Sequence, residues 1–147
     1  MAVNKRKGVT LHEIFTEVGK AKTREEKIEV LRSYNELYVR DVLKGAYDDS
    51  IQFLLPKGTP PYEPAPEENP PTHLKRMTKR FKYFVHGGPG ETISKLKVES
   101  MFISVLEGVH PDDAKIVCLM KDKELAGVYK GLTKKLAAEA FPGLIAK

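Results

Sequence analysis

The sequence predicts an all-α fold of about seven helices in one domain. Three observations support this prediction: apolar residues recur at helical spacing along most of the chain, capping residues precede these stretches, and no segment shows convincing strand-type alternation. A chain of 147 residues can also bury a core without disulfides. We expect a single helical domain over residues 1–147, with a basic tail at residues 1–9 and a proline-rich loop at residues 56–71.

Each of the first three expected helices follows a residue that can cap it. Thr10 is followed by Glu13, and Thr23 by Glu26, which is the spacing of a capping box. Asn35 is expected to cap the third helix. The apolar residues that predict one buried face on each of these helices are Leu11, Ile14, Phe15, Val18, Ile28, Leu31, Tyr34, Tyr38, Val39, Val42, Leu43 and Ala46.

The middle of the chain is rich in proline. Seven of the ten prolines fall between Pro56 and Pro71, in a stretch that also carries three glutamates. Proline lacks an amide donor and fixes φ, so this stretch is expected to be an extended connection. Residues 50–55, just before it, fit either a short extended piece or a helical one.

Four more helices are expected in the second half. They are a helix from Thr72 to Val85, a long helix from about Glu91 to Glu107, a helix opened by Pro111, and a last helix that Thr133 caps and Pro142 stops. The residues predicted to face the core here are Leu74, Met77, Phe81, Phe84, Val85, Ile93, Leu96, Met101, Phe102, Val105, Leu106, Leu136, Ala137, Ala140 and Phe141.

The composition favours some partners and compartments over others. Lysine and arginine total 25 against 20 acidic residues, a net charge of +5 that suits an anionic partner, although many basic domains have none. Cys118, the one cysteine, lies in an apolar stretch and is expected to be buried, and a chain without disulfides suits a reducing compartment. No apolar run approaches the roughly 20 residues of a membrane span. We expect a cytoplasmic protein with no membrane partner.

The residue types that catalysis needs are scattered. His12, His73, His86 and His110 lack the spacing and the cysteine partners of a zinc site. The glycine-rich stretch at residues 87–90 lacks the lysine and the serine or threonine of a nucleotide-binding loop. We therefore expect no enzymatic activity, no metal and no cofactor.

Three features suggest phosphate binding, and the first is a run of cations on the expected helix from Thr72 to Val85. Like charges this close repel one another unless something neutralises them, although a solvated helix face is the usual interpretation of such a run. The five cations, which fall within eight residues, are Lys75, Arg76, Lys79, Arg80 and Lys82.

The other two features are glycine-led turns that open helices. The turn at residues 87–92 is followed by Lys95, and residues 130–135 (KGLTKK) place two lysines in the first turn of the last helix. Helix N-termini present free amides and a positive dipole end, which suit a phosphate but not a lysine. A plain interhelical turn also explains the first stretch, and unoptimised surface charge also explains the second.

The same segments resemble the N-terminal DNA-binding part of phage-type ATP-dependent DNA ligases. Residues 23–55 (TREEKIEVLRSYNELYVRDVLKGAYDDSIQFLL) resemble the opening helices of those enzymes. Residues 87–120 resemble their G-x-G-[ST] turn with the two helices that follow, and residues 121–145 resemble their last helix. The ending FPGLI is especially similar to T-even phage ligases. The chain also resembles a family of small proteins from tailed phages, including phages of cyanobacteria.

This resemblance implies an all-helical domain that grips duplex DNA across the minor groove, largely through phosphates. In the ligases the nucleophile follows in a K-x-D-G motif, which this chain lacks, since residues 121–124 (KDKE) have no glycine. From the three features and the resemblance together, the candidate DNA-binding residues are the five cations and Gly88, Gly90, Thr92, Lys95, Lys130, Gly131, Thr133, Lys134 and Lys135.

The expected function is that of a non-catalytic accessory protein in phage DNA replication, repair or recombination. Its partner would be double-stranded DNA, intact, nicked or gapped, bound with little sequence specificity. The alternative is a protein adapter that uses the ligase-like helical scaffold to engage a sliding clamp, a ligase or another replication or host factor, and the acidic, proline-rich segment favours it. A role inside the virion is a third hypothesis.

Overall fold

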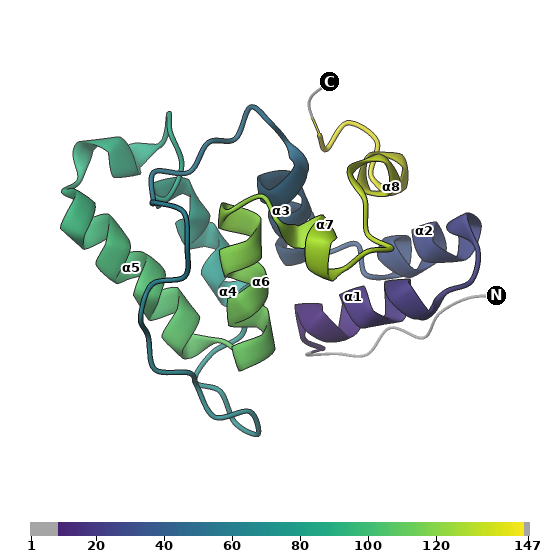
Figure 1. Cartoon of the computed structure of the whole chain (residues 1–147), viewed down its shortest axis with the longest axis horizontal. Coiled ribbons are helices and arrows are strands. Elements are labelled where there is room, and N and C mark those ends of the chain that lie inside the picture. Colours follow the sequence, from purple (N-terminus) through teal and green to yellow (C-terminus); the bar gives the residue numbers. More distant parts are fainter. Residues whose placement is uncertain (1–8, 146–147) are drawn as a thin grey trace.

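The computed structural model describes residues 9–145, and this part of the chain folds into eight α-helices and two short 3₁₀-helices (Figure 1). The all-α prediction is confirmed. An isolated antiparallel bridge between Phe53 and Val85 is the one strand-like pairing among the described residues, and residues 50–55, expected as either extended or helical, contain no helix. Except for Val9, the predicted basic tail lies outside the described residues. No described helix is both long and apolar enough to cross a membrane.

The first two helices begin where the sequence predicts. Helix α1 (Leu11–Lys20) has the complete capping box, in which Thr10 accepts the amide of Glu13 and Glu13 accepts the amide of Thr10. Helix α2 (Arg24–Ser33) is capped by Thr23, which accepts the amide of Glu26. The prediction of a full capping box is wrong here. In a full box the Glu26 carboxylate would accept the Thr23 amide, but it accepts the Lys22 amide at 3.4 Å instead.

Helix α3 (Leu37–Tyr47) begins one residue later than predicted. Glu36, rather than Asn35, occupies the N-cap position and makes no side-chain capping bond. The reason is a tight turn in which the Glu36 amide donates to the carbonyl of Tyr34 at 2.8 Å. The predicted apolar face of this helix is buried, from Tyr38 to Ala46.

The helix predicted for residues 72–85 is shorter and mostly of the 3₁₀ type. It consists of α4 (Leu74–Met77) and the 3₁₀-helix η1 (Thr78–Tyr83), and His73 rather than Thr72 caps it by accepting the Lys75 amide at 2.9 Å. The end is pulled into extended backbone because Phe84 and His86 exchange hydrogen bonds with residues 52–54. Gly87, with φ of +85°, then turns the chain.

The long helix expected from Glu91 also begins late. A 3₁₀-helix, η2 (Pro89–Thr92), comes first, and α5 (Lys95–Gly108) starts only after Ser94, which accepts the Lys97 amide. Leu96 therefore sits in the first turn of α5 and is 80% exposed, so its predicted burial is wrong. Phe102, Val105 and Leu106 are buried as predicted.

Of the remaining helices, α6 (Pro111–Lys121) and α8 (Lys134–Ala140) were predicted and α7 (Leu125–Val128) was not. Helix α6 has its proline in the first turn and buries Cys118. Helix α7 has four residues, and α8 is capped by Thr133, which accepts the Leu136 amide.

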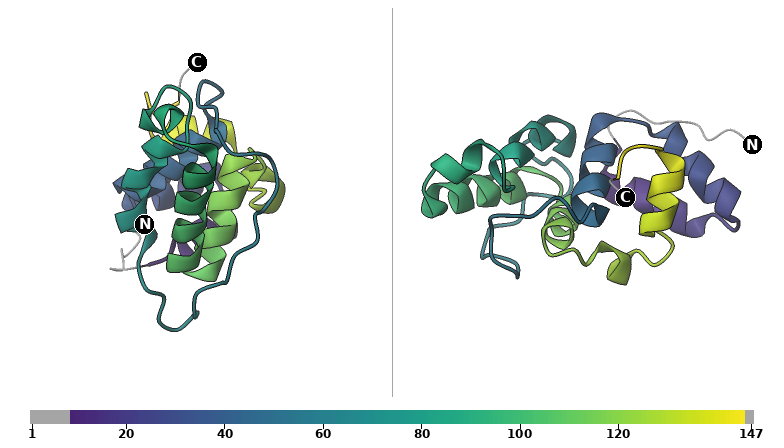
Figure 2. Two further views of the ribbon diagram at one scale, coloured as in Figure 1. Left: turned by 90° about the vertical axis from the view of Figure 1, so that its left-hand side faces the viewer. Right: turned by 90° about the horizontal axis from the view of Figure 1, so that it is seen from above.

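Helices α3 and α6 pack on each other in the middle of the molecule (Figure 1). On one side α1, α2 and α8 pack together, and on the other side α5 packs on α6 while α4 and η1 run along α3 (Figures 1 and 2). The proline-rich loop runs across α5 and α6 (Figure 1). Its anchor is the buried Lys121, whose Nζ donates to the carbonyls of Pro56 at 2.8 Å and Gly58 at 2.9 Å. Helix α3 therefore lies between the group formed by α1, α2 and α8 and the segment formed by α4 and η1 (Figure 1).

Candidate nucleic-acid interface

The cationic segment formed by α4 and η1 runs alongside α3 in the same direction. At its start, Lys75 Nζ lies 3.6 Å from the Glu36 carboxylate. One turn later Thr78 hydrogen-bonds Asp41, and Lys82 shares a cleft with Lys44. This register sets the lysines of the segment beside Lys44, the lysine of α3.

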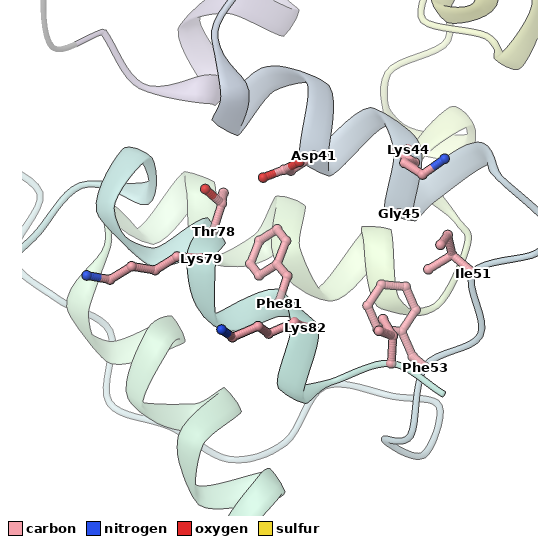
Figure 3. Close-up of a pocket in the computed structure, with 10 residues that line it drawn as sticks. Asp41, Lys44, Gly45, Ile51, Phe53, Thr78, Lys79, Phe81 and Lys82 are labelled. Atoms are coloured by element: carbon pink, nitrogen blue, oxygen red, sulfur yellow. The ribbon is translucent and has the colours of Figure 1, made fainter. Parts of the chain in front are cut away.

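The lysine cleft lies between the two elements and has a volume of about 250 Å³. Its interior is largely apolar, and Figure 3 shows the rings of Phe53 and Phe81 in it, with the ammonium ends of Lys79 and Lys82 pointing away from them. Both lysines are exposed. The residues that line it are Asp41, Lys44, Gly45, Ile51, Phe53, Thr78, Lys79, Phe81, Lys82 and Val85.

Asp41 is the single acid among the residues that line the lysine cleft. Burial raises the pKa of its carboxyl, while the Arg40 charge and the hydrogen bond from Thr78 oppose that rise. Three lysines, Lys44, Lys79 and Lys82, line the same cleft as this carboxyl. The lining residues therefore carry a net positive charge, and Asp41 is the one acid among them.

Further lysines gather at the C-terminal end of α3. Lys44 Nζ binds the Asp48 carboxylate at 2.9 Å, and Lys123 Nζ donates to the carbonyls of Gly45 and Asp48. Lys134, at the start of α8, lies 3.1 Å from Asp49. Cations at a helix C-terminus are stabilised by the exposed carbonyls and the negative dipole end, which explains why lysines are tolerated here. The predicted Lys134 thus sits at the end of α3 with part of its charge balanced.

The glycines of the turn at residues 87–92 have a packing role. A Cβ atom on Gly88 would lie 2.2 Å from the carbonyl oxygen of Lys82, and one on Gly90 would lie 1.9 Å from that of Tyr83. These contacts require glycine whether or not the turn binds a ligand. Thr92 is also engaged internally, since its hydroxyl donates to the carbonyl of Pro89 at 2.9 Å.

An acid also occupies this turn. His86 Nδ1 lies 3.1 Å from the Glu91 carboxylate, and hydrogen bonds from the His86 side chain and the Gly87 amide lower the pKa of Glu91. An ionised carboxylate here repels a phosphate. The free amides of α5 begin four residues later, at Lys95, which is exposed and lines a separate cleft with Leu54 and Glu99.

The turn before α8 is more open. A Cβ atom on Gly131 would lie 3.1 Å from Lys27 Nζ and 3.8 Å from Gly19 Cα, so this position is less constrained than Gly88 or Gly90. Lys130 and Lys135 are exposed. Thr133 is committed to capping α8.

The structure thus brings together some of the predicted residues and separates others. Lys75, Lys79 and Lys82 lie beside α3, with Lys134 at its end. On the same segment Arg76 is exposed and Arg80 half-buried. Lys95 is separate from this group, because the cleft that it lines is a different one.

Sequence reasoning missed Lys44, which lines the lysine cleft, and Arg40, one turn before it. The signal that could have found them was their spacing of four residues on the polar side of a helix whose other face is apolar. Among residues 9–145, no group of three or more histidine, cysteine or acidic side chains is placed to hold a metal ion.

The sequence matches the model of a known protein family. A family model described as a family of unknown function, DUF6433, matches residues 14–127. This range includes α3, α4, η1 and the whole lysine cleft, and it stops before α8. No curated protein matches the sequence.

Proposed function

The chain belongs to this family of unknown function, and we propose that it binds duplex DNA through the phosphate backbone without catalysing a reaction. The observation that carries the proposal is the lysine cleft, which is lined by Lys44, Lys79 and Lys82 from two parallel helical segments and by a single acid. Lysines on a rigid helical frame supply the electrostatic, sequence-independent part of DNA affinity. Their placement, more than the net charge, distinguishes this surface from an ordinary basic one.

The resemblance to the DNA-binding part of phage ligases supports the same proposal. It suggests duplex DNA, intact, nicked or gapped, as the partner, and an accessory role in phage DNA replication, repair or recombination. Lysine binds phosphate as a point charge rather than as a planar fork, so we expect little discrimination among base sequences.

The test is a titration of labelled intact, nicked, gapped and single-stranded DNA between about 50 and 200 mM salt, a range over which binding through phosphates weakens steeply. We expect duplex binding with a steep salt dependence. The double variant Lys79→Gln/Lys82→Gln should lower duplex affinity about tenfold at low salt. It should also reduce the salt slope by about 1 for each phosphate that a lysine no longer neutralises.

The matched control is Lys20→Gln/Lys115→Gln, which removes the same charge from two exposed positions on α1 and α6. It should change affinity by no more than about twofold if position rather than net charge governs binding. Absence of duplex binding at low salt would refute the proposal. Equal losses in the two double variants would assign binding to net charge and refute the lysine cleft as its site.

A second proposal is that the proline-rich segment engages a replication protein such as a sliding clamp or a ligase, or a host factor. The favouring observation is that Lys121, only 6% exposed, is committed to holding the segment on α6 while Glu67 and Glu68 stay exposed. Changing both glutamates to glutamine should abolish capture of a purified clamp or ligase and leave DNA binding intact. Unchanged capture by this variant, or no capture by the unmodified chain, would argue against the adapter role.

A further inference from the structure

A second cleft lies on the other side of α3, between the α2–α3 connection and the segment after α8. Its volume is about 570 Å³. No acid is among its lining residues, which are Arg32, Asn35, Arg40, Ala140, Phe141, Pro142, Gly143 and Leu144. We call it the arginine cleft, because two guanidinium groups are its only charged groups.

Arg32 is held in place by the end of α8. Its Nε donates to the carbonyl of Ala140 and its Nη2 to that of Glu139, both at 3.0 Å. A guanidinium has five N–H donors in a planar fork, and these bonds use two of them. The others stay available on a side chain whose position is already fixed.

The Nε of Arg40, unlike that of Arg32, has no hydrogen-bond acceptor among the described residues. Arg40 lines the cleft half-buried, and this Nε atom is buried. No hydrogen bond or ion pair of its guanidinium occurs within residues 9–145. A buried charged donor without an acceptor is unfavourable, and a water, an ion or a ligand that accepts its hydrogen bond relieves this cost.

From these two arginines we infer that the cleft binds a phosphate group. Arginine forks match phosphate oxygens bidentately, and the cleft is lined by a guanidinium that is already held in place and by one whose Nε has no acceptor, together with Asn35. The two arginines come from α2 and α3, and residues 140–144 complete the lining. The arginine cleft shares no lining residue with the lysine cleft.

The two clefts are linked through Lys44. This lysine lines the lysine cleft, and its Nζ donates at 2.8 Å to the carbonyl of Leu144, which lines the arginine cleft. A phosphodiester backbone that crosses α3 therefore meets cations on both flanks. That use of the site rests on the proposed DNA binding, whereas binding of a free phosphate does not.

The first experiment follows the arginine Nε–H signals by NMR during titration with inorganic phosphate. We expect saturable shifts of the Arg40 and Arg32 signals, loss of the Arg32 shift in Arg40→Gln, and retention of both shifts in Lys115→Gln. Arg40→Lys keeps the charge but not the fork, so it should bind phosphate at least several-fold more weakly. Absence of any saturable shift in the unmodified chain, or unchanged binding by Arg40→Gln, overturns the inference.

The second experiment measures duplex DNA binding by Arg40→Gln and by the Lys115→Gln control. We expect a loss of about fivefold and a reduction of the salt slope by about 1 in the first variant only. If phosphate binds at Arg40 but no variant or unmodified chain binds DNA, the proposed function fails and the phosphate site stands. If DNA binds normally to Arg40→Gln and phosphate shifts are absent, the site fails and the proposed function stands.

Folding does not confound these tests. Arg40 donates no hydrogen bond within the described residues, so Arg40→Gln should keep the thermal midpoint of the unmodified chain. A large fall in the midpoint would mean that Arg40 stabilises the fold itself and would overturn the ligand role.

Discussion

Asp113 accepts the backbone amide of Leu11 at 3.0 Å, across a sequence separation of 102 residues. A second bond, from the His12 amide at 2.8 Å, goes to its other carboxylate oxygen. The start of α6 therefore completes the capping of α1, since the first amides of a helix have no partner within it. The two helices are joined at their N-termini by one buried side chain.

Replacing Asp113 by alanine should lower the free energy of unfolding by about 2 kcal/mol, because two amides at the start of α1 lose their acceptors. Urea denaturation measures the change. Asp112→Asn is the control, since Asp112 is only half-buried and its nearest cations are histidines at 3.8 and 3.9 Å. It should change stability by less than about 1 kcal/mol. Equal effects of the two substitutions would show that the bonds to α1 contribute little.

The caps show which features of this fold could be predicted from sequence. Thr10, Thr23 and Thr133 each cap the helix expected of them, because capping depends on residues three positions apart. The bonds from Asp113 could not be predicted in this way, since nothing local relates residue 113 to residue 11. The same holds for the 3₁₀ form of η1, which ends where residues 52–54 pair with Phe84 and His86.

Gly90→Ala should destabilise the chain by about 3 kcal/mol, since its Cβ would lie 1.9 Å from the Tyr83 carbonyl oxygen and backbone would have to move. Thermal unfolding checks this. Gly19→Ala is the matched control, because Gly19 lies in α1 with nothing within 4 Å of an added Cβ. It should stabilise by about 0.5–1 kcal/mol through helix propensity. A mild effect of Gly90→Ala on folding, with loss of DNA binding, would contradict the packing role.

The candidate site was only partly predictable for a related reason. A run of five cations is visible in the sequence, but which of them gather depends on α4 and η1 running parallel to α3. The meeting of Arg32 and Arg40 in one cleft gave no local signal, because that cleft is closed by residues 140–144, about a hundred positions later. Phosphate sites formed between distant segments require the fold.

DNA binding should depend on pH through protonation of the Asp41 carboxyl. Burial raises the pKa of this carboxyl, so it takes up its proton at a higher pH than an ordinary aspartate as the solution is acidified. Protonation removes the one negative charge of the lysine cleft, and duplex affinity should therefore rise as pH falls through that raised pKa. Asp41→Asn should bind more tightly at neutral pH and lose this part of the pH dependence.

The control for Asp41 is Asp112→Asn, which removes one carboxyl from α6 and leaves the lysine cleft unchanged. Its binding curve should keep the pH dependence of the unmodified chain. If Asp41→Asn and Asp112→Asn respond alike to pH, Asp41 has no part in the effect.

Lys121 should control the order of the proline-rich segment. Its Nζ, buried beside the Phe102 ring, donates to the carbonyls of Pro56 and Gly58 and to Asp122, so one side chain holds the beginning of the segment on α6. Lys121→Ala leaves these carbonyls without a donor and should cost about 2 kcal/mol of unfolding free energy. It should also raise protease cleavage and amide exchange within residues 56–71, while α1 and α2 stay protected. Lys57→Ala is the control, because that side chain is 74% exposed and pairs with Glu124 at 3.6 Å on the surface. If both variants leave the segment protected, its attachment does not depend on Lys121.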